Sequence, residues 1–179
     1  MRIIGGKYRG RVLPVPKGFK ARPTTDFARE NLFNIIENSF DLTTIAVLDL
    51  FAGTGGISYE FASRGTPSID VVEIELHNFN HIRKTAIALD FTQIHVIRND
   101  VFKFLGFCHK TYDLIFADPP YSCAKIPQIA TMVINNRLLN QNGCLIIEHS
   151  AANSFAETAG FFRHKSYGSV NFSFFNAIP

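Results

Sequence analysis

The sequence predicts an α/β domain built on a mostly parallel sheet. Three observations support this prediction. Short apolar runs alternate with stretches of helical periodicity from about residue 45 onward, the first run is almost entirely apolar, and it ends in a glycine-rich loop at 53–56. Strands that alternate with helices usually pair in parallel through right-handed crossovers. At 179 residues, the chain is long enough for one substantial domain with a short appendage.

The first part of the chain, up to about residue 18, has the pattern of a β-hairpin, because short apolar pairs flank glycines that permit a tight turn. Pro14 and Pro16 lack the N–H that a further ladder bond needs, so the second strand ends there or lies at an edge. A helix is expected to begin at 22–26, where Thr24 or Thr25 can cap its first turn.

Five strands and three further helices are predicted between residues 45 and 150. The strands are expected at 45–51, 69–74, 94–97, 112–117 and 144–147, and the helices at 57–64, 77–89 and 126–139. Two β-like stretches within 160–179 are expected to add an antiparallel hairpin at one edge of the sheet. The phenylalanines of the last stretch are interpreted as sheet packing rather than as a platform for stacking bases.

The charge of the chain is unevenly distributed. Residues 1–22 contain seven basic and no acidic side chains, a charge of +7, whereas the rest contains eleven basic and fifteen acidic ones, a charge of −4. A basic segment on a mildly acidic body is typical of a protein that contacts phosphates with one end. A solvated terminal segment would give the same charge distribution.

Composition argues against several classes of protein. Hydrophobic residues make up 46% of the chain, enough to fill a core, and no apolar run approaches the ~20 residues of a membrane span. The first eleven residues contain no apolar signal core. The three cysteines form no closely spaced pair, which argues against a disulfide framework or a cysteine-bound zinc ion. We therefore expect a cytoplasmic protein without a membrane span or a bound metal.

In open parallel sheets, ligands bind beyond the carboxyl ends of the strands. The first predicted strand carries Asp49 and leads into the loop 51–56, whose glycines let a ligand approach the backbone. Ser58 occupies the place where a dinucleotide fingerprint has glycine or alanine, and a carboxylate before the loop would repel a pyrophosphate. Asp49 suits a ligand with a positive amino or sulfonium group, unless the loop is only a tight structural turn.

Acidic residues also end the second and third predicted strands. Glu73, or Glu75 two residues later, could accept both hydroxyls of a ribose, and Asp100 could accept from the amino group of an adenine. Each acid taken alone could equally be a solvated side chain. Their recurrence at consecutive strand ends favours a common nucleoside ligand.

The sharpest motif, Asp118-Pro119-Pro120-Tyr121, follows the fourth predicted strand. Its two prolines fix the backbone and leave carbonyl groups free to accept hydrogen bonds. Asp118 and the Pro119 carbonyl can accept the two protons of a planar amino group and so turn its nitrogen lone pair toward an electrophile. Tyr121 can then stack on the base that carries this group. The alternative is a turn that merely closes the strand.

Four segments carry a family resemblance: RIIGGKYRGR at 2–11, RPTTD with the following RE within 22–30, DLFAGTGG at 49–56 and DPPY at 118–121. In these segments the chain resembles the bacterial family that methylates the exocyclic N2 of a guanine in 16S ribosomal RNA. The last two motifs are shared by many S-adenosylmethionine-dependent amino-methyltransferases, whereas the first two are much narrower. The resemblance implies a Rossmann-like class I methyltransferase fold with a seven-stranded sheet, S-adenosylmethionine as cofactor and the small ribosomal subunit as partner.

The resemblance also implies roles for individual residues. The residues expected to contact the cofactor are Thr24, Thr25, Asp49, Phe51, Ala52, Gly53, Thr54, Gly55, Glu73, Asp100 and Val101. The target base would be held by Asp118, Pro119, Pro120 and Tyr121. The residues expected to contact RNA are Arg2, Lys7, Tyr8, Arg9, Arg11 and Arg22. The chain would then divide into an RNA-contacting appendage at 1–22 and a methyltransferase domain at 23–179, and act as a monomer.

Two other functions remain open at this point. An adenine-N6 methyltransferase acting on DNA or RNA would use the same Asp-Pro-Pro-Tyr motif. A non-catalytic RNA-binding factor for ribosome assembly would need only the basic N-terminal segment. A nicotinamide oxidoreductase is disfavoured by Asp49, by Ser58 and by the proline motif.

Overall fold

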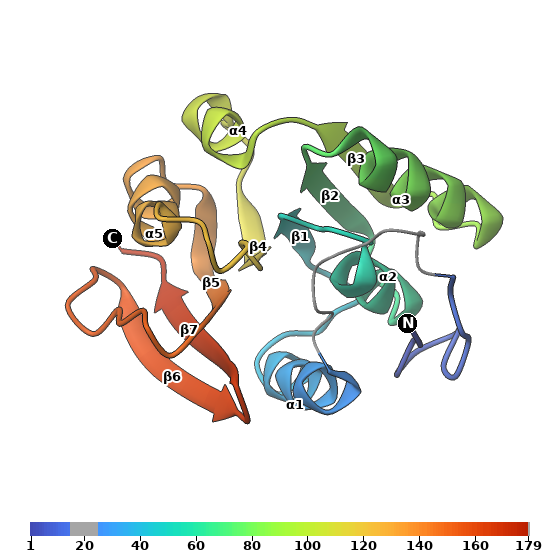
Figure 1. The fold of residues 1–179 in the computed structure, drawn as a ribbon, viewed down its shortest axis with the longest axis horizontal. Helices are drawn as coiled ribbons and strands as arrows, with labels where there is room; N and C mark the ends of the chain where they lie inside the picture. Colours follow the sequence, from blue (N-terminus) through green and yellow to red (C-terminus); the bar gives the residue numbers. More distant parts are fainter. Residues whose placement is uncertain (15–24, 179) are drawn as a thin grey trace.

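The computed structural model describes residues 1–14 and 25–178 of the chain. They form one seven-stranded sheet with helices on both faces (Figure 1). The strands are β1 (Ala46–Leu50), β2 (Ser68–Glu73), β3 (Ile94–Arg98), β4 (Tyr112–Ala117), β5 (Leu139–His149), β6 (Phe161–Tyr167) and β7 (Val170–Asn176). The helices are α1 (Asp26–Glu37), α2 (Gly56–Ser63), α3 (Leu76–Ala88), α4 (Val101–Phe107) and α5 (Ile126–Asn135).

The strands lie in the order β3-β2-β1-β4-β5-β7-β6. The first five strands in this order are parallel to one another, whereas β7 is antiparallel to both β5 and β6. This arrangement confirms the predicted seven-stranded, mostly parallel sheet with an antiparallel C-terminal hairpin. The chain order reverses between β1 and β4, which lie side by side at the centre of the sheet (Figure 1). The carboxyl ends of these two strands therefore flank the switch point, where ligands bind in folds of this kind.

Each face of the sheet packs against its own core. On one face α1, α2 and α3 cover the strands, and Phe33 of α1 meets Phe61 of α2 with ring centroids 4.7 Å apart. On the other face α4 and α5 pack against the sheet. Side chains alternate along a strand, so that the neighbours Leu114 and Ile115 contribute to opposite cores. The same alternation decides which face each side chain at the end of a strand can reach.

The sequence prediction was wrong at three places. Helix α4 lies between β3 and β4, where no helix was predicted, and Asp100 caps its first turn. Helix α5 ends at Asn135 rather than at 139, because Arg137 adopts a left-handed conformation with a φ of 53°. Strand β5 already begins at Leu139, so the predicted fifth strand was also too short.

Residues 1–14, the described part of the predicted hairpin, fold back through an isolated antiparallel bridge between Arg2 and Val12 and pack against the rest of the domain, whereas the end of the predicted hairpin with Pro16 lies outside the described residues. The N–H of Ile3 donates to the Arg11 carbonyl at 3.0 Å, and the N–H of Gly10 donates to the Ile3 carbonyl at 2.8 Å. Ile3 and Leu13 are buried in the same core as α1 and α2. These residues are therefore an integral part of the domain core as well as a basic surface.

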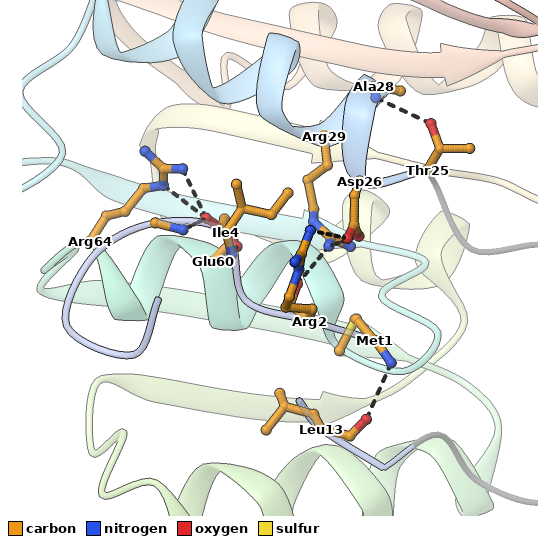
Figure 2. Close-up of polar contacts among 11 residues, drawn as sticks. Met1, Arg2, Ile4, Leu13, Thr25, Asp26, Ala28, Arg29, Glu60 and Arg64 are labelled. Carbon is orange, nitrogen blue, oxygen red and sulfur yellow. Dashed lines mark hydrogen bonds and ion pairs between the residues drawn. The ribbon is translucent and has the colours of Figure 1, made fainter. Parts of the chain in front are cut away.

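The buried carboxylate of Glu60, on α2, holds the hairpin in place. It accepts hydrogen bonds from the N–H groups of Ile4 at 2.9 Å and Gly5 at 2.7 Å (Figure 2). The Arg64 guanidinium also donates to it at 2.8 Å. A carboxylate that is only 1% exposed would be costly to bury alone, and these donors from two segments compensate for the lost water.

Candidate active site

Four acidic residues stand at or just beyond the carboxyl ends of central strands. They are Asp49 on β1, Glu73 on β2, Asp118 after β4 and Glu148 on β5, and we call them the carboxylate cluster. The register pairs Asp49 with Phe116, which packs in the core beneath α1 and α2. Because side chains alternate, the same face is reached from all four positions. The cluster therefore lies at one edge and on one face of the sheet, beside the switch point.

Asp49 is buried at the contact between β1 and α2, where it accepts a hydrogen bond from the Ser58 hydroxyl. Burial raises the pKa of Asp49 to about 7, the bond from Ser58 opposes this rise, and the charges of Asp118 and Glu73 add to it. The salt bridges found within 1–14 and 25–178 involve none of these three carboxylates. A cation bound beside Asp49 would favour its charged form.

The loop after β1 turns sharply. Phe51, Gly53 and Gly55 all lie in the left-handed region, with φ values of 59°, 56° and 83°. Glycine adopts this conformation readily, but for Phe51 it costs about 1–3 kcal/mol, which the surrounding structure must offset. The N–H of Gly55 closes the turn on the Ala52 carbonyl at 2.8 Å, directly before α2. The loop, including the buried Thr54, thus brings the N-terminus of α2 to the edge where the cluster lies.

Glu73 ties this loop to β2. One of its carboxylate oxygens accepts from the Gly53 N–H at 2.8 Å, and the other accepts from the Glu75 N–H at 2.7 Å. Burial raises the pKa of Glu73, while these two backbone bonds oppose the rise. A carboxylate offers about four acceptor positions, so Glu73 can still receive the hydroxyls of a ribose. Of the two acids considered from the sequence, Glu73 lies in the cluster and Glu75 is exposed.

The Asp-Pro-Pro-Tyr motif forms the turn that follows β4. The N–H of Asp118 donates to the Leu50 carbonyl at 3.3 Å, which keeps the motif aligned with β1. The Pro120 carbonyl accepts from the N–H three residues later at 2.8 Å and so closes the turn. Pro119 is buried, and Tyr121 is 56% exposed. The backbone therefore fixes Asp118 at the edge of the sheet and leaves the tyrosine at the surface.

Glu148 is the member of the cluster that the sequence analysis missed. It is 3% exposed, and burial together with the charge of Glu148 raises the pKa of Asp118 well above its usual value. The signal for Glu148 was present in the sequence, because it directly follows the apolar run 144–147. The same inspection of strand ends that identified the other acids would have found it on the fifth strand.

Asp100 and Val101 stand at the start of α4. The Asp100 carboxylate accepts from the Lys103 N–H at 2.9 Å and so caps the helix, and Val101 is buried. The ring of Phe102 lies 6.0 Å from the ring of Phe51, which connects the start of α4 with the loop after β1. The start of α4 and the loop after β1 thus meet through these two rings.

The predicted helix cap at the N-terminus of α1 is Thr25. Its hydroxyl accepts from the Ala28 N–H at 3.1 Å (Figure 2). Thr24 and Arg22 lie outside the described residues, and so does the predicted domain boundary between 22 and 23.

The basic side chains of the N-terminal hairpin fall into two groups. Arg2 pairs with Asp26 at 3.1 Å, and its carbonyl accepts from the buried Arg29 at 2.7 Å (Figure 2). The second group consists of Lys7, Arg9 and Arg11, which are exposed, as Arg2 also is. Arg2 therefore helps to hold the hairpin on α1, while Lys7, Arg9 and Arg11 face solvent around the turn.

Tyr8 anchors the turn of the hairpin. Its hydroxyl donates to the Leu89 carbonyl at 2.8 Å, and its ring meets the Phe91 ring edge-on at 5.1 Å. Its backbone N–H donates to the Ser63 hydroxyl at 2.9 Å. The tyrosine predicted to contact RNA thus engages both its ring and its hydroxyl within the protein, and it positions the basic residues beside it.

No helix within 1–14 and 25–178 is long and apolar enough to cross a membrane. In the same ranges, no group of three or more histidine, cysteine, aspartate and glutamate side chains is arranged to hold a metal ion. Cys108, Cys123 and Cys144 are all free thiols.

Comparison with known proteins gives matches along nearly the whole chain. The family described as "Conserved hypothetical protein 95" matches residues 1–176. A protein of Buchnera aphidicola subsp. Baizongia pistaciae, named ribosomal RNA small subunit methyltransferase D, is 35% identical over 148 residues, which cover 83% of this chain and 75% of that protein. A Bacillus subtilis protein, named putative rRNA methyltransferase YlbH, is 33% identical over 175 residues, 94% of each chain.

The fold is also shared with solved structures. The structure described as putative methyltransferase yhhF from Escherichia coli matches with a TM-score of 0.86 at 27% identity, and it covers 99% of this chain and 97% of that one. The match therefore includes the sheet and the N-terminal hairpin. The architecture is a Rossmann-like class I methyltransferase fold.

Proposed function

Since the chain belongs to the Conserved hypothetical protein 95 family, whose matching relatives include proteins named rRNA methyltransferases, we propose that it methylates the exocyclic N2 amine of a guanine in 16S ribosomal RNA. The methyl donor is S-adenosylmethionine, and the substrate is presented on the small ribosomal subunit. The observation that carries this proposal is the carboxylate cluster beside the switch point. A group of acids, three of them buried and Asp118 partly exposed, fits both a positively charged donor and a base that offers N–H groups.

The cluster and the loop beside it fit S-adenosylmethionine. Asp49 has a pKa of about 7, so both its neutral and its charged forms are present near neutral pH. A sulfonium or amino group placed beside it stabilises the charged form. The backbone of the glycine loop can approach the methionine half closely. We assign the methionine half to Asp49, Phe51, Ala52, Gly53, Thr54, Gly55, Thr24 and Thr25, the ribose to Glu73, and the adenine to Asp100 and Val101.

Asp118 and its motif hold the target amine. The Asp118 carboxylate and the Pro119 carbonyl accept the two amino protons, so the nitrogen lone pair points toward the methyl group. The exposed ring of Tyr121 stacks on the flat face of the extruded base. Extrusion costs a few kcal/mol, and least where the guanine already lies in a loop.

S-adenosylmethionine supplies a methyl group on a sulfonium centre, which leaves as a neutral thioether. The lone pair of the amine forms the new N–C bond, while the electron pair of the broken S–C bond stays on sulfur. Positive charge then develops on the nitrogen, next to the Asp118 carboxylate, which stabilises it and accepts the released proton. Positioning of the two reactants supplies most of the catalysis, on the order of 7–11 kcal/mol.

The N-terminal hairpin contacts the RNA around the target. Lys7, Arg9 and Arg11 are exposed around its turn and carry the charge that phosphates need. Tyr8 fixes this turn to the domain, so the basic side chains are held at a defined place relative to the carboxylate cluster.

The proposal is tested by incubating the purified protein with small ribosomal subunits from a strain that lacks this gene, using S-adenosylmethionine labelled in its methyl group. Mass analysis of the nucleosides is expected to find labelled N2-methylguanosine. Labelled N6-methyladenosine would replace the proposal by the adenine alternative. A parallel reaction with naked 16S RNA shows whether the assembled subunit is required.

Binding of S-adenosylhomocysteine tests the enzyme assignment separately. Titration calorimetry is expected to find one site for each chain. Absence of binding would overturn the methyltransferase assignment and favour a cofactor-independent assembly factor.

A further inference from the structure

Asp118 directly follows β4, and Glu148 lies near the end of the neighbouring parallel strand β5. Strands β4 and β5 pair in register as far as Ala117 and Ile147, and the next residues along the chain are Asp118, the first after β4, and Glu148 on β5. Neighbouring strands lie about 4.8 Å apart, and side chains at equivalent positions point to the same face. The two carboxyl groups therefore stand side by side, in agreement with the effect of Glu148 on the pKa of Asp118.

Buried apolar side chains flank Glu148 along and across the sheet. Its neighbour on β7 is the fully buried Phe172, and Ile146, two residues earlier on β5, is buried on the same face. A carboxyl group in such surroundings has lost most of its hydration, which hydrogen-bond donors or a proton must replace. The base site beyond the strand ends is the side from which a ligand can bring further donors.

On the premise of the proposed function, we propose that Glu148 is a specificity-determining residue that accepts a hydrogen bond from N1–H of the target guanine, beside Asp118. In guanine, N1–H and the N2 amine are adjacent donors, and the two neighbouring carboxyl groups present only acceptors to them when both are charged. In adenine the ring nitrogen beside the amine is an acceptor, so Glu148 would face a lone pair. Asp118 thus holds the amine of either base, whereas Glu148 selects guanine.

A base analogue isolates this contact. 2-Aminopurine keeps the amine at position 2 but lacks the hydrogen on N1. The probe is therefore a small subunit reconstituted with 2-aminopurine in place of the target guanine. Wild-type protein is expected to prefer guanine by about 10-fold or more in kcat/KM. In Glu148→Gln the amide can donate as well as accept, so the activity on guanine falls by about 10- to 100-fold and the preference narrows by about 10-fold.

Two further measurements separate this role from a structural one. Affinity for S-adenosylhomocysteine is expected to stay within about threefold in Glu148→Gln, because the contact is with the base. Asp70→Asn is the matched control, since Asp70 is also buried but lies near the amino end of β2, bonded to Tyr112 at 2.8 Å and Lys110 at 2.7 Å. This control is expected to lower the melting temperature and to leave the preference between the two bases unchanged.

The outcomes distinguish this inference from the function on which it rests. If Glu148→Gln keeps the wild-type preference between guanine and 2-aminopurine, or changes it no more than Asp70→Asn does, Glu148 does not select the base. 2-Aminopurine also lacks the guanine O6, and comparison of the two proteins removes that contribution. If wild-type protein forms no N2-methylguanosine on unmodified subunits, the proposed function fails together with this inference.

Discussion

The Ser58 hydroxyl, near the start of α2, donates a hydrogen bond to the carboxylate of Asp49 on β1. This bond favours the charged form of Asp49, whereas burial raises its pKa to about 7. Asp49 therefore changes its charge near neutral pH. It does so in the part of the site that we assign to the positively charged half of the methyl donor.

The first prediction is that affinity for S-adenosylmethionine rises with pH through neutrality. The donor is cationic at its sulfur and binds better beside a charged Asp49, which becomes protonated as the pH falls below about 7. Ser58→Ala removes a bond that favours the charged form, so the midpoint should move upward by about one pH unit. Calorimetry across the neutral range measures both curves. The change of affinity near pH 7 should vanish in Asp49→Asn. If it persists in that variant, it is due to the titration of another group.

Asp49 is also expected to make the stability of the protein depend on pH. Stability should fall as the pH rises, whereas the affinity for S-adenosylmethionine should increase. The pKa of Asp49 in the folded protein lies above its value in the unfolded chain, about 3.9. Its contribution to stability is therefore complete below about pH 4 and is lost as the pH rises toward 7. Asp49→Asn should reduce the loss of stability in that window by up to about 1 kcal/mol per pH unit. Urea denaturation at a series of pH values measures this, and parallel curves for the two proteins would contradict it.

Asp118→Ala should abolish methyl transfer and leave the affinity for S-adenosylhomocysteine within a few-fold. The variant removes the acceptor that orients the amine and stabilises its developing charge, a loss of about 1,000-fold or more in kcat. Single-turnover transfer of a labelled methyl group gives the rate, and calorimetry gives the affinity. Asp113→Asn is the control, because Asp113 lies near the amino end of the same strand and accepts from the Ala46 N–H at 2.8 Å. Retained turnover in Asp118→Ala would show that another group orients the amine.

Replacing Arg9 and Arg11 by glutamine should weaken RNA binding and flatten its salt dependence. Each lost phosphate contact reduces the slope of log affinity against log salt by roughly one. Binding to 16S RNA at several salt concentrations gives the slope. Arg137→Gln is the control, since Arg137 is exposed before β5, remote in sequence from the hairpin. An unchanged slope in the double variant would limit the hairpin to a structural role.

The sheet and most of the cluster could be predicted because their signals are local. Asp49, Glu73 and Asp118 each stand at or directly after a short apolar run, and parallel strands bring such ends to one edge whatever the rest of the chain does. Glu148 obeys the same rule, because it directly follows the apolar run of the fifth strand. Helix α4 was missed for a physical reason, since it has only seven residues and gives little periodicity to detect.

The attachment of the N-terminal hairpin could not be predicted, because it depends on contacts between distant residues. Glu60 lies in a helix with no apparent reason to be buried, and the N–H groups that satisfy it belong to Ile4 and Gly5, more than 50 positions away. Tyr8 was predicted to contact RNA, and its partners within the protein, Leu89 and Phe91, meet it only in the folded chain. No pattern within a short window carries such pairings.

Glu60→Gln is therefore expected to detach the hairpin. A glutamine amide would turn one N–H₂ group toward donors that need an acceptor, and Arg64 would lose its buried partner. The free energy of unfolding should fall by about 2–4 kcal/mol, as measured by urea denaturation. Trypsin should then cleave within residues 1–14 faster than in the wild type, and the affinity for 16S RNA should fall because the basic turn is no longer held in place. Glu30→Gln, on the exposed face of α1, is the matched control. If trypsin cleaves residues 1–14 of Glu60→Gln no faster than those of the wild type, the buried apolar contacts of Ile3 and Leu13 hold the hairpin without the carboxylate.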